Sequence, residues 1–220
     1  MSTFSYNIVK IKSCYTRCRC MSSQTRYSAT LPANPFAFHQ TRTIAEIMLR
    51  CNDRSAVKNE VHEGNLLQIK TISNEDSIFN YVYNRMNLIS DSLKKIIING
   101  DEADGRFVNL ISIMNYDTLF KEFVEDVYYE RLIDRNPVTD YDIMSFFEKK
   151  GRENQTIASW KYVTVYKLRR LYARILFEAG LLKTSTGNRV VCTPYVSRST
   201  IDELLNEGYE TYIRATLGYR

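Results

Sequence analysis

The side chains best suited to chemistry in this sequence are basic and lie in its last third. Residues 155–198 contain eight Lys or Arg residues and a single acid, Glu178. Lys167, Arg170 and Arg174 follow one another at helical spacing, with Arg169 at the border of the same side. A helix face that is merely hydrated usually mixes both signs of charge. The imbalance therefore predicts contact with a polyanion, nucleic acid above all.

The elements that would position these cations can be identified from the apolar pattern. Six apolar residues recur at steps of three and four on the opposite side of the helix and predict a buried stripe. They are Leu168, Leu171, Tyr172, Ile175, Leu176 and Ala179. Gly180 would cap the helix, and residues 181–183 and 189–193 flank a Ser-Thr-Gly-Asn turn that predicts a small β-hairpin. Helix, stop and hairpin in this order are typical of a recognition helix and its wing, which favours duplex DNA as the partner.

Most of the expected DNA contacts are to phosphates, which give affinity without sequence choice. Thr164 and Tyr166, near the start of the helix, could touch base edges, although core packing fits Tyr166 equally well. The prediction requires a break at Thr164 that separates a short helix over 157–163 from the recognition helix; one continuous helix would weaken it. The expected DNA-binding residues are Lys161, Thr164, Lys167, Arg169, Arg170, Arg174, Lys183 and Arg189.

Earlier in the chain, apolar periodicity and capping residues predict a bundle of six helices. Their expected ranges are 40–51, 56–62, 73–87, 91–98, 101–115 and 117–134. Asn136-Pro137 marks a boundary, because the residue before proline is driven out of helical geometry. Beyond it, Thr139 or Asp140 would cap a helix that ends at Gly151, and Ser199 or Thr200 would cap a last helix to Leu205.

The expected fold is thus mainly α, with a helical bundle over 27–136 and a winged-helix-like domain over 137–220. Residues 1–26 lack periodicity and predict a flexible basic arm. The abrupt change near Met21 suggests a second translation start, which would make residues 1–20 an upstream extension. Net charge is segmented: about +6 over 1–45, −6 over 46–154 and +7 over 155–198. A polyanion would meet the outer segments, and the acidic middle would suit a protein partner.

Several function classes are disfavoured. The sequence has no apolar run long enough for a membrane span and no secretory signal. Five cysteines are an odd number and indicate reduced thiols in the cytoplasm, with Cys14, Cys18 and Cys20 lacking a fourth metal ligand at finger spacing. No nucleophile signature accompanies the two histidines, and no glycine-rich phosphate loop is present. We therefore expect no catalysis and no cofactor. Tyr128-Tyr129 and the tyrosines at 81 and 83 are expected to pack in the core rather than stack on bases.

Three separated stretches resemble the BrxA family of BREX bacteriophage-exclusion systems. They are Gly-Asn-Leu-Leu-Gln at 64–68, Phe-Val-Glu-Asp-Val-Tyr-Tyr-Glu-Arg at 123–131, and the succession of residues 142–147, 164–169 and 178–182. The resemblance covers about residues 27–205 and rests on order and spacing. It implies a non-enzymatic, largely helical component of a phage-defence operon that binds double-stranded DNA and works with other BREX proteins. It also implies a bundle like that of transcription antitermination factors.

Two rival hypotheses remain open. One is an RNA-binding regulator of the antitermination kind, which would prefer RNA to duplex DNA at a fixed salt concentration. The other is an assembly adaptor whose basic segment meets an acidic protein surface, without binding nucleic acid.

Overall fold

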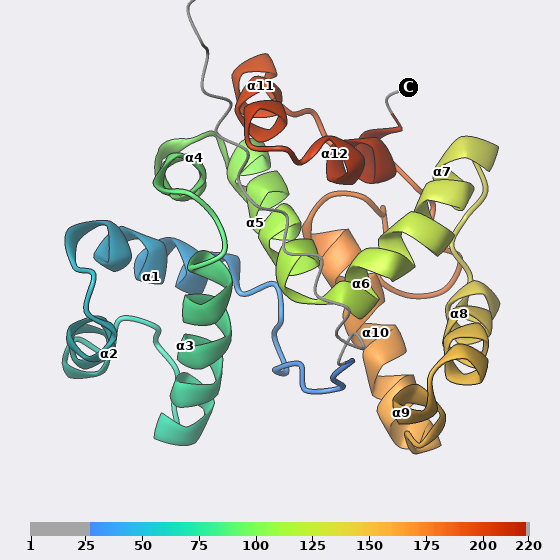
Figure 1. Ribbon diagram of the computed structural model, residues 1–220, viewed down its shortest axis with the longest axis horizontal. Coiled ribbons are helices and arrows are strands. Elements are labelled where there is room, and N and C mark those ends of the chain that lie inside the picture. The colour runs from blue at the N-terminus through green and yellow to red at the C-terminus, as the bar shows by residue number, and fades with distance from the viewer. Residues whose placement is uncertain (1–26, 219–220) are drawn as a thin grey trace, which may run out of the picture.

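A computed structural model describes residues 27–218, and helices account for most of this range (Figure 1). The helical segments are α1 (Phe38–Arg50), α2 (Arg54–Glu63), α3 (Ile72–Met86), α4 (Asp91–Asn99), α5 (Glu102–Tyr116), α6 (Thr118–Phe123), η1 (Val124–Tyr128), α7 (Tyr129–Asp134), α8 (Asp140–Glu153), α9 (Gln155–Ala158), α10 (Tyr162–Glu178), α11 (Arg198–Asn206) and α12 (Glu210–Leu217). The expectation of a mainly α-helical protein is confirmed. The basic arm and the three clustered cysteines expected within residues 1–26 lie outside the described range.

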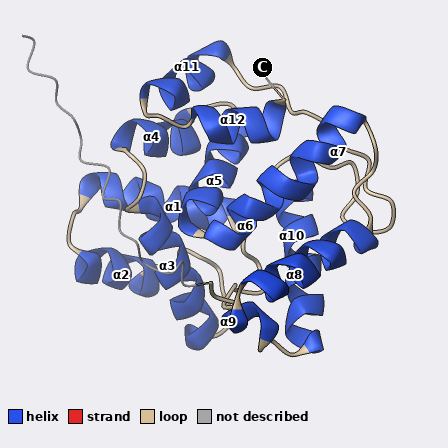
Figure 2. Ribbon diagram, turned by 45° about the vertical axis from the view of Figure 1, so that its right-hand side comes forward, coloured by secondary structure: helices blue, strands red, loops and turns tan. Residues whose placement is uncertain are grey.

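Helix α5 is the centre of the packing (Figure 2). It contacts α1, α3, α4, α6 and α10, and buried residues occur on every side of it, from Phe107 and Val108 to Ile113 and Met114. A helix that is apolar all round must be covered all round. The other helices are amphipathic and each turns an apolar stripe inward, as Ile44 and Ile47 do on α1.

The core also contains a charged side chain that the sequence did not single out. Arg85 on α3 is fully buried; its Nη2 donates to Thr41 Oγ1 at 2.6 Å and its Nη1 to the Pro35 carbonyl at 3.4 Å. Its guanidinium lies 4.9 Å from the centre of the Tyr81 ring. Burial lowers the pKa of Arg85. These contacts tie α3 to α1 and to the segment that precedes α1.

The expected helices are all present, with different ends in some places. Asp53 caps α2 and Thr139 caps α8, and Thr139 forms a reciprocal capping box with Asp142. Several expected ends are wrong: α1 spans Phe38–Arg50 instead of 40–51, and α2 begins at Arg54 instead of 56. Helix α3 begins after Thr71 rather than at Ser73, α8 runs through Gly151 to Glu153, and α11 is capped by Ser197. In these three helices a neighbouring residue in extended geometry marks the boundary. The local sequence pattern does not show which residue adopts that geometry.

Two features of the helical part were not foreseen. The expected helix over 117–134 is helical throughout, but its middle turn, η1, is π-helical. Tyr128 in this turn donates its hydroxyl to the Cys192 carbonyl at 3.0 Å, which joins the bundle to the segment after α10. A further helix, α12, follows α11 where the sequence analysis ended the last helix at Leu205.

The expected β-hairpin is not present as a pair of strands. Within residues 27–218 the only β-type pairings are isolated antiparallel bridges, Leu182 to Val191 and Val138 to Arg189. Residues 181–183 and 189–193 do run alongside each other, since Lys183 N donates to the Val190 carbonyl and Cys192 N to the Leu181 carbonyl. A short two-stranded ribbon without further strands beside it is marginal, which accounts for the missing ladder.

The final helices return to the N-terminal part of the chain. Helix α11 packs on α4, and α12 packs on η1 (Figure 1). Buried Asp104 on α5 accepts hydrogen bonds from the backbone N–H of Ser197 at 2.8 Å and from the Thr200 hydroxyl at 3.0 Å. The division at residue 136 stays a prediction. None of the helices within 27–218 has the length and apolar character required to cross a bilayer.

Candidate nucleic-acid interface

Helix α10 is held in place by its apolar stripe, as the sequence predicted. All six expected stripe residues are buried, and the helix packs on α8 and α5. Tyr172 lies at the centre of an aromatic cluster, with ring centres 5.0 Å from Phe120, 5.2 Å from Phe123 and 5.6 Å from Phe147. Burial raises the pKa of Tyr172 well above its usual value, so the phenol stays neutral. The outward face of α10 is thereby fixed relative to the bundle.

The break before α10 lies earlier than expected. Helix α9 is a single turn capped by Asn154, and Lys161 in extended geometry precedes α10. Thr164 therefore sits inside the first turn of α10, half-buried, and does not cap it. The two helices are separate, but the winged-helix arrangement expected here lacks its strands.

A groove of about 570 Å³ lies between the outward face of α10 and the loop at residues 185–189. Five of the eight expected DNA-binding residues line it: Lys167, Arg169, Arg170, Arg174 and Arg189. Ser185, Thr186 and Gly187 form the loop side, and Ala33, from the segment before α1, is also at the border. The structure thus brings together cations from two separate stretches of sequence.

These five cations differ in how freely they can act. Lys167 and Arg170 are exposed, and neither has an ion-pair partner within residues 27–218. Arg174 is exposed but lies 2.5 Å, Nε to Oε1, from Glu178 one turn later. Exposed pairs of this spacing are weak and easily exchanged for another anion.

Arg169 and Arg189 are joined to one carboxylate, Asp140, in the first turn of α8. Arg169 Nη1 lies 2.6 Å from Asp140 Oδ2, and Arg189 Nη2 lies 2.7 Å from Asp140 Oδ1. The Arg189 side chain is 4% exposed and also donates from Nε to the Ser185 carbonyl at 3.0 Å. Arg189 therefore holds the loop to α8 and cannot reach a phosphate in this arrangement, contrary to the direct contact expected for it.

The remaining expected residues lie away from the groove. Lys161 is exposed at the N-terminus of α10, and Lys183 is exposed beyond its C-terminus. Neither has an ion pair among the described residues. Thr164 does not line the groove.

Three residues, Asp140, Tyr162 and Val163, were missed by sequence reasoning. Asp140 was considered only as a helix cap, because its partners follow 29 and 49 residues later and no local signal joins them. At the first turn of α10, Tyr162 is 70% and Val163 75% exposed, although apolar residues of this size usually face inward. Tyr166 was left open between core and surface; it is 41% exposed, lines the groove, and carries the Arg169 guanidinium 4.5 Å from its ring centre.

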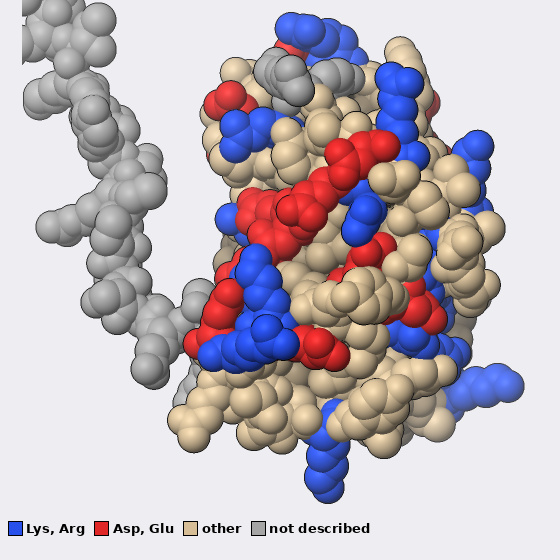
Figure 3. Space-filling view, turned by 90° about the vertical axis from the view of Figure 1, so that its right-hand side faces the viewer, with Lys and Arg blue, Asp and Glu red and all other residues tan. Residues whose placement is uncertain are grey.

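The charge pattern elsewhere is mixed. Figure 3 shows a band of acidic side chains on the face that carries α7 and α8, interrupted by Lys and Arg. Lys150 on α8 lies 2.7 Å from Glu122 Oε2 on α6, and carboxylates of η1 extend the network. Such a face does not favour a polyanion. No cluster of His, Cys, Asp or Glu within residues 27–218 is arranged to hold a metal ion.

Comparison with known proteins identifies the family. A model of the BrxA family matches residues 25–208. The chain belongs to the BrxA family. It is 31% identical over 199 residues to the BREX protein BrxA of Bacillus cereus (strain H3081.97), a match that covers 90% of this chain and 100% of that protein. An uncharacterized protein from Magnetospirillum magneticum has a similar crystal structure, with a TM-score of 0.75 at 18% identity over 87% of this chain and 97% of the other. The BrxA resemblance inferred from the sequence is confirmed, and the crystal structure shows the same fold in another protein.

Proposed function

We propose that this BrxA-family protein binds double-stranded DNA through α10 and the loop at 185–189, as a non-enzymatic accessory of a BREX phage-defence system. It would act by docking, in company with other BREX proteins, and would need no cofactor. The single observation that carries the proposal is that Lys167 and Arg170, exposed and without an ion pair within residues 27–218, line one groove on the outward face of α10. A merely hydrated helix face usually pairs such cations with acids.

The spacing of the free cations suits a phosphate backbone. At about 1.5 Å of rise per residue, Arg170 and Arg174 lie about 4.5 and 10.5 Å along the helix axis from Lys167. Phosphates of one strand follow at about 3.4 Å along the duplex axis. With α10 aligned along the duplex axis, a run of a few phosphates would meet Lys167 and Arg170, and would meet Arg174 once it exchanges its weak pair with Glu178.

Sequence choice, if present, would come from the first turn of α10. Exposed Tyr162 and Val163, with Tyr166 one turn later, offer apolar contacts of the kind made to thymine methyl groups in the major groove. Base contacts of this kind specify sequence, whereas the phosphate contacts only position the protein.

The test is fluorescence anisotropy with a duplex over a range of salt concentrations. Each lost phosphate contact lowers the salt slope by about one, so K167A/R170A should lower it by about two and weaken binding to every duplex. The matched control is K70A/K95A, which removes one exposed lysine from the loop before α3 and another from α4. Equal salt slopes for wild type and K167A/R170A would show that α10 does not contact the DNA phosphates. A preference for RNA in competition at one salt concentration would favour the RNA-binding alternative, and no nucleic-acid binding above about 0.1 M salt would favour the adaptor.

A further inference from the structure

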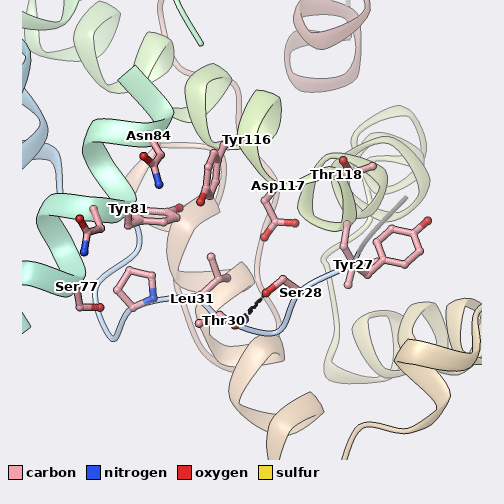
Figure 4. A pocket seen from close by; sticks show the side chains of 13 residues that line it. Tyr27, Ser28, Thr30, Leu31, Ser77, Tyr81, Asn84, Tyr116, Asp117 and Thr118 are labelled. Carbon is pink, nitrogen blue, oxygen red and sulfur yellow. Dashed lines mark hydrogen bonds between the residues drawn. The ribbon is translucent and has the colours of Figure 1, made fainter. Parts of the chain in front are cut away.

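A second hollow, unrelated to the basic groove, lies between the segment at 27–32, helix α3 and the start of α6. Its volume is about 570 Å³, and its lining includes Asp117, Tyr81, Tyr116 and Asn84, labelled in Figure 4, together with Asn80. None of the lining residues within 27–218 is a Lys or Arg. The hollow is therefore a polar and aromatic pocket, in contrast to the cationic groove beside α10.

Asp117 is the one carboxylate among the described residues that line the pocket. The side chain caps α6 by accepting from the Phe120 N–H at 3.0 Å, and no basic side chain pairs with it among the described residues. Burial raises the pKa of Asp117 to about 6, with a smaller contribution from the negative charge of Glu122. At neutral pH the pocket thus holds a negative charge with which no side chain of residues 27–218 forms an ion pair.

The aromatic walls add a polar group that also lacks a partner. Tyr81 is 6% exposed, and its hydroxyl makes no hydrogen bond within residues 27–218. Its ring meets that of Tyr116 edge-on, with centres 5.5 Å apart. In Figure 4 the hydroxyl end of Tyr81 points toward Tyr116 and the side of the pocket where Asp117 lies. A buried hydroxyl without a partner is costly, and at the wall of a pocket a ligand atom would supply the missing hydrogen bond.

The two amides on α3 leave Asp117 as the strongest acceptor. Arg54, outside the pocket, donates to Asn80 Oδ1 at 2.6 Å and to Asn84 Oδ1 at 3.0 Å. Both amide oxygens are therefore occupied, and the amide N–H groups remain. Buried Arg85 lies beside the Tyr81 ring, 4.9 Å from its centre; its two Nη atoms donate to Thr41 and to the Pro35 carbonyl, and its Nε has no partner within residues 27–218.

We propose that this pocket binds a small organic cation, with the ammonium group against the Asp117 carboxylate and the hydroxyls and ring faces of Tyr81 and Tyr116 around it. A carboxylate beside aromatic rings is a favourable setting for an ammonium ion, because the ring faces and the carboxylate are both negative. The site is separate from the proposed DNA groove, and its occupancy does not depend on DNA binding.

The experiment uses the whole chain without DNA, with putrescine as the probe and 1,4-butanediol as its uncharged counterpart. Calorimetry at about pH 7.5 and about 0.15 M salt should show saturable 1:1 binding of putrescine and a diol affinity lower by about tenfold or more. D117N keeps a helix-capping oxygen but removes the negative charge, so it should lower the affinity for putrescine by about tenfold or more. E46Q, which removes an exposed carboxylate from α1, should leave binding unchanged.

Two further measurements separate a ligand contact from a structural role. Y81F removes the unpartnered hydroxyl, so it should lower the affinity for putrescine several-fold without lowering the melting temperature of the protein. Affinity should also fall as the pH drops through about 6, since protonation removes the charge of Asp117. No saturable binding up to about 10 mM, equal binding by wild type and D117N, or equal affinity for the diol would each overturn the proposal. If D117N does not fold, putrescine affinity that is unchanged in Y81F and unchanged across the pH series would also overturn the proposal.

Discussion

Asp140→Asn is the sharpest perturbation of the basic groove. The wild-type carboxylate joins Arg169 at 2.6 Å to Arg189 at 2.7 Å and so connects α8, α10 and the loop at 185–189. Asn retains one acceptor oxygen, which leaves one of the two guanidinium groups facing an amide N–H₂. Arg189 is the more affected, because its side chain is 4% exposed and water cannot replace the lost carboxylate.

The expected loss of stability is about 2 kcal/mol. Breaking a buried charge pair costs about 3–5 kcal/mol, but Asp140 itself is 49% exposed, and solvent screens part of the interaction. For a chain of this size, 1 kcal/mol corresponds to about 2–4 °C, so the melting temperature followed by circular dichroism should fall by about 4–8 °C.

Asp202→Asn is the matched control. The Asp202 side chain is also 49% exposed and pairs with Arg198 one turn away on the surface of α11. An exposed pair at this spacing contributes about 0.3–0.5 kcal/mol, which predicts a shift of about 1–2 °C. If D140N and D202N lower the melting temperature by the same amount, Asp140 does not hold α8, α10 and the loop together.

The same substitution should act in the opposite direction on DNA affinity. One unit charge about 10 Å from a phosphate in water contributes about 0.4 kcal/mol, so removing the repulsive carboxylate should tighten binding about twofold below the melting transition. Anisotropy at low salt measures this change. Weaker binding by the folded variant would contradict our view that exposed Lys167 and Arg170 make the contacts without help from Asp140.

Two other predictions concern buried groups. Y128F should lower the free energy of unfolding by about 1 kcal/mol in chemical denaturation, because the Tyr128 hydroxyl donates to the Cys192 carbonyl. Y172F should leave this free energy unchanged or raise it, because the buried Tyr172 hydroxyl has no partner among the described residues. Equal losses of stability in the two variants would contradict this contrast. Asp117 has a pKa raised from 3.8 to about 6, so the native state binds the extra proton and stability relative to D117N should fall as the pH rises from about 4 to about 6. The change should be at most about 3 kcal/mol in urea denaturation at each pH, and parallel stability profiles for the two proteins would show that the carboxyl is not buried.

The sequence alone was sufficient for features that depend on neighbours along the chain. The stripe from Leu168 to Ala179 is buried as expected, since a helix places every third and fourth residue on one side. Asp53 and Thr139 cap their helices because a cap needs only the next three residues. Helix α12 was missed because its one buried turn, around Ile213, follows Gly208 with little apolar periodicity before it.

What the sequence by itself determined was thus the set of helices, their inward faces and the excess of cations near α10. Tertiary structure alone decided which of those cations are free, since Asp140 forms ion pairs with Arg169 and Arg189, which lie 29 and 49 residues later in the chain. It also decided that Asp104 accepts a hydrogen bond from the backbone N–H of Ser197, which lies 93 residues later in the chain. The physical reason is the range of the forces: helix periodicity and capping act within one turn, whereas a charge pairs with any group that packing brings within about 4 Å.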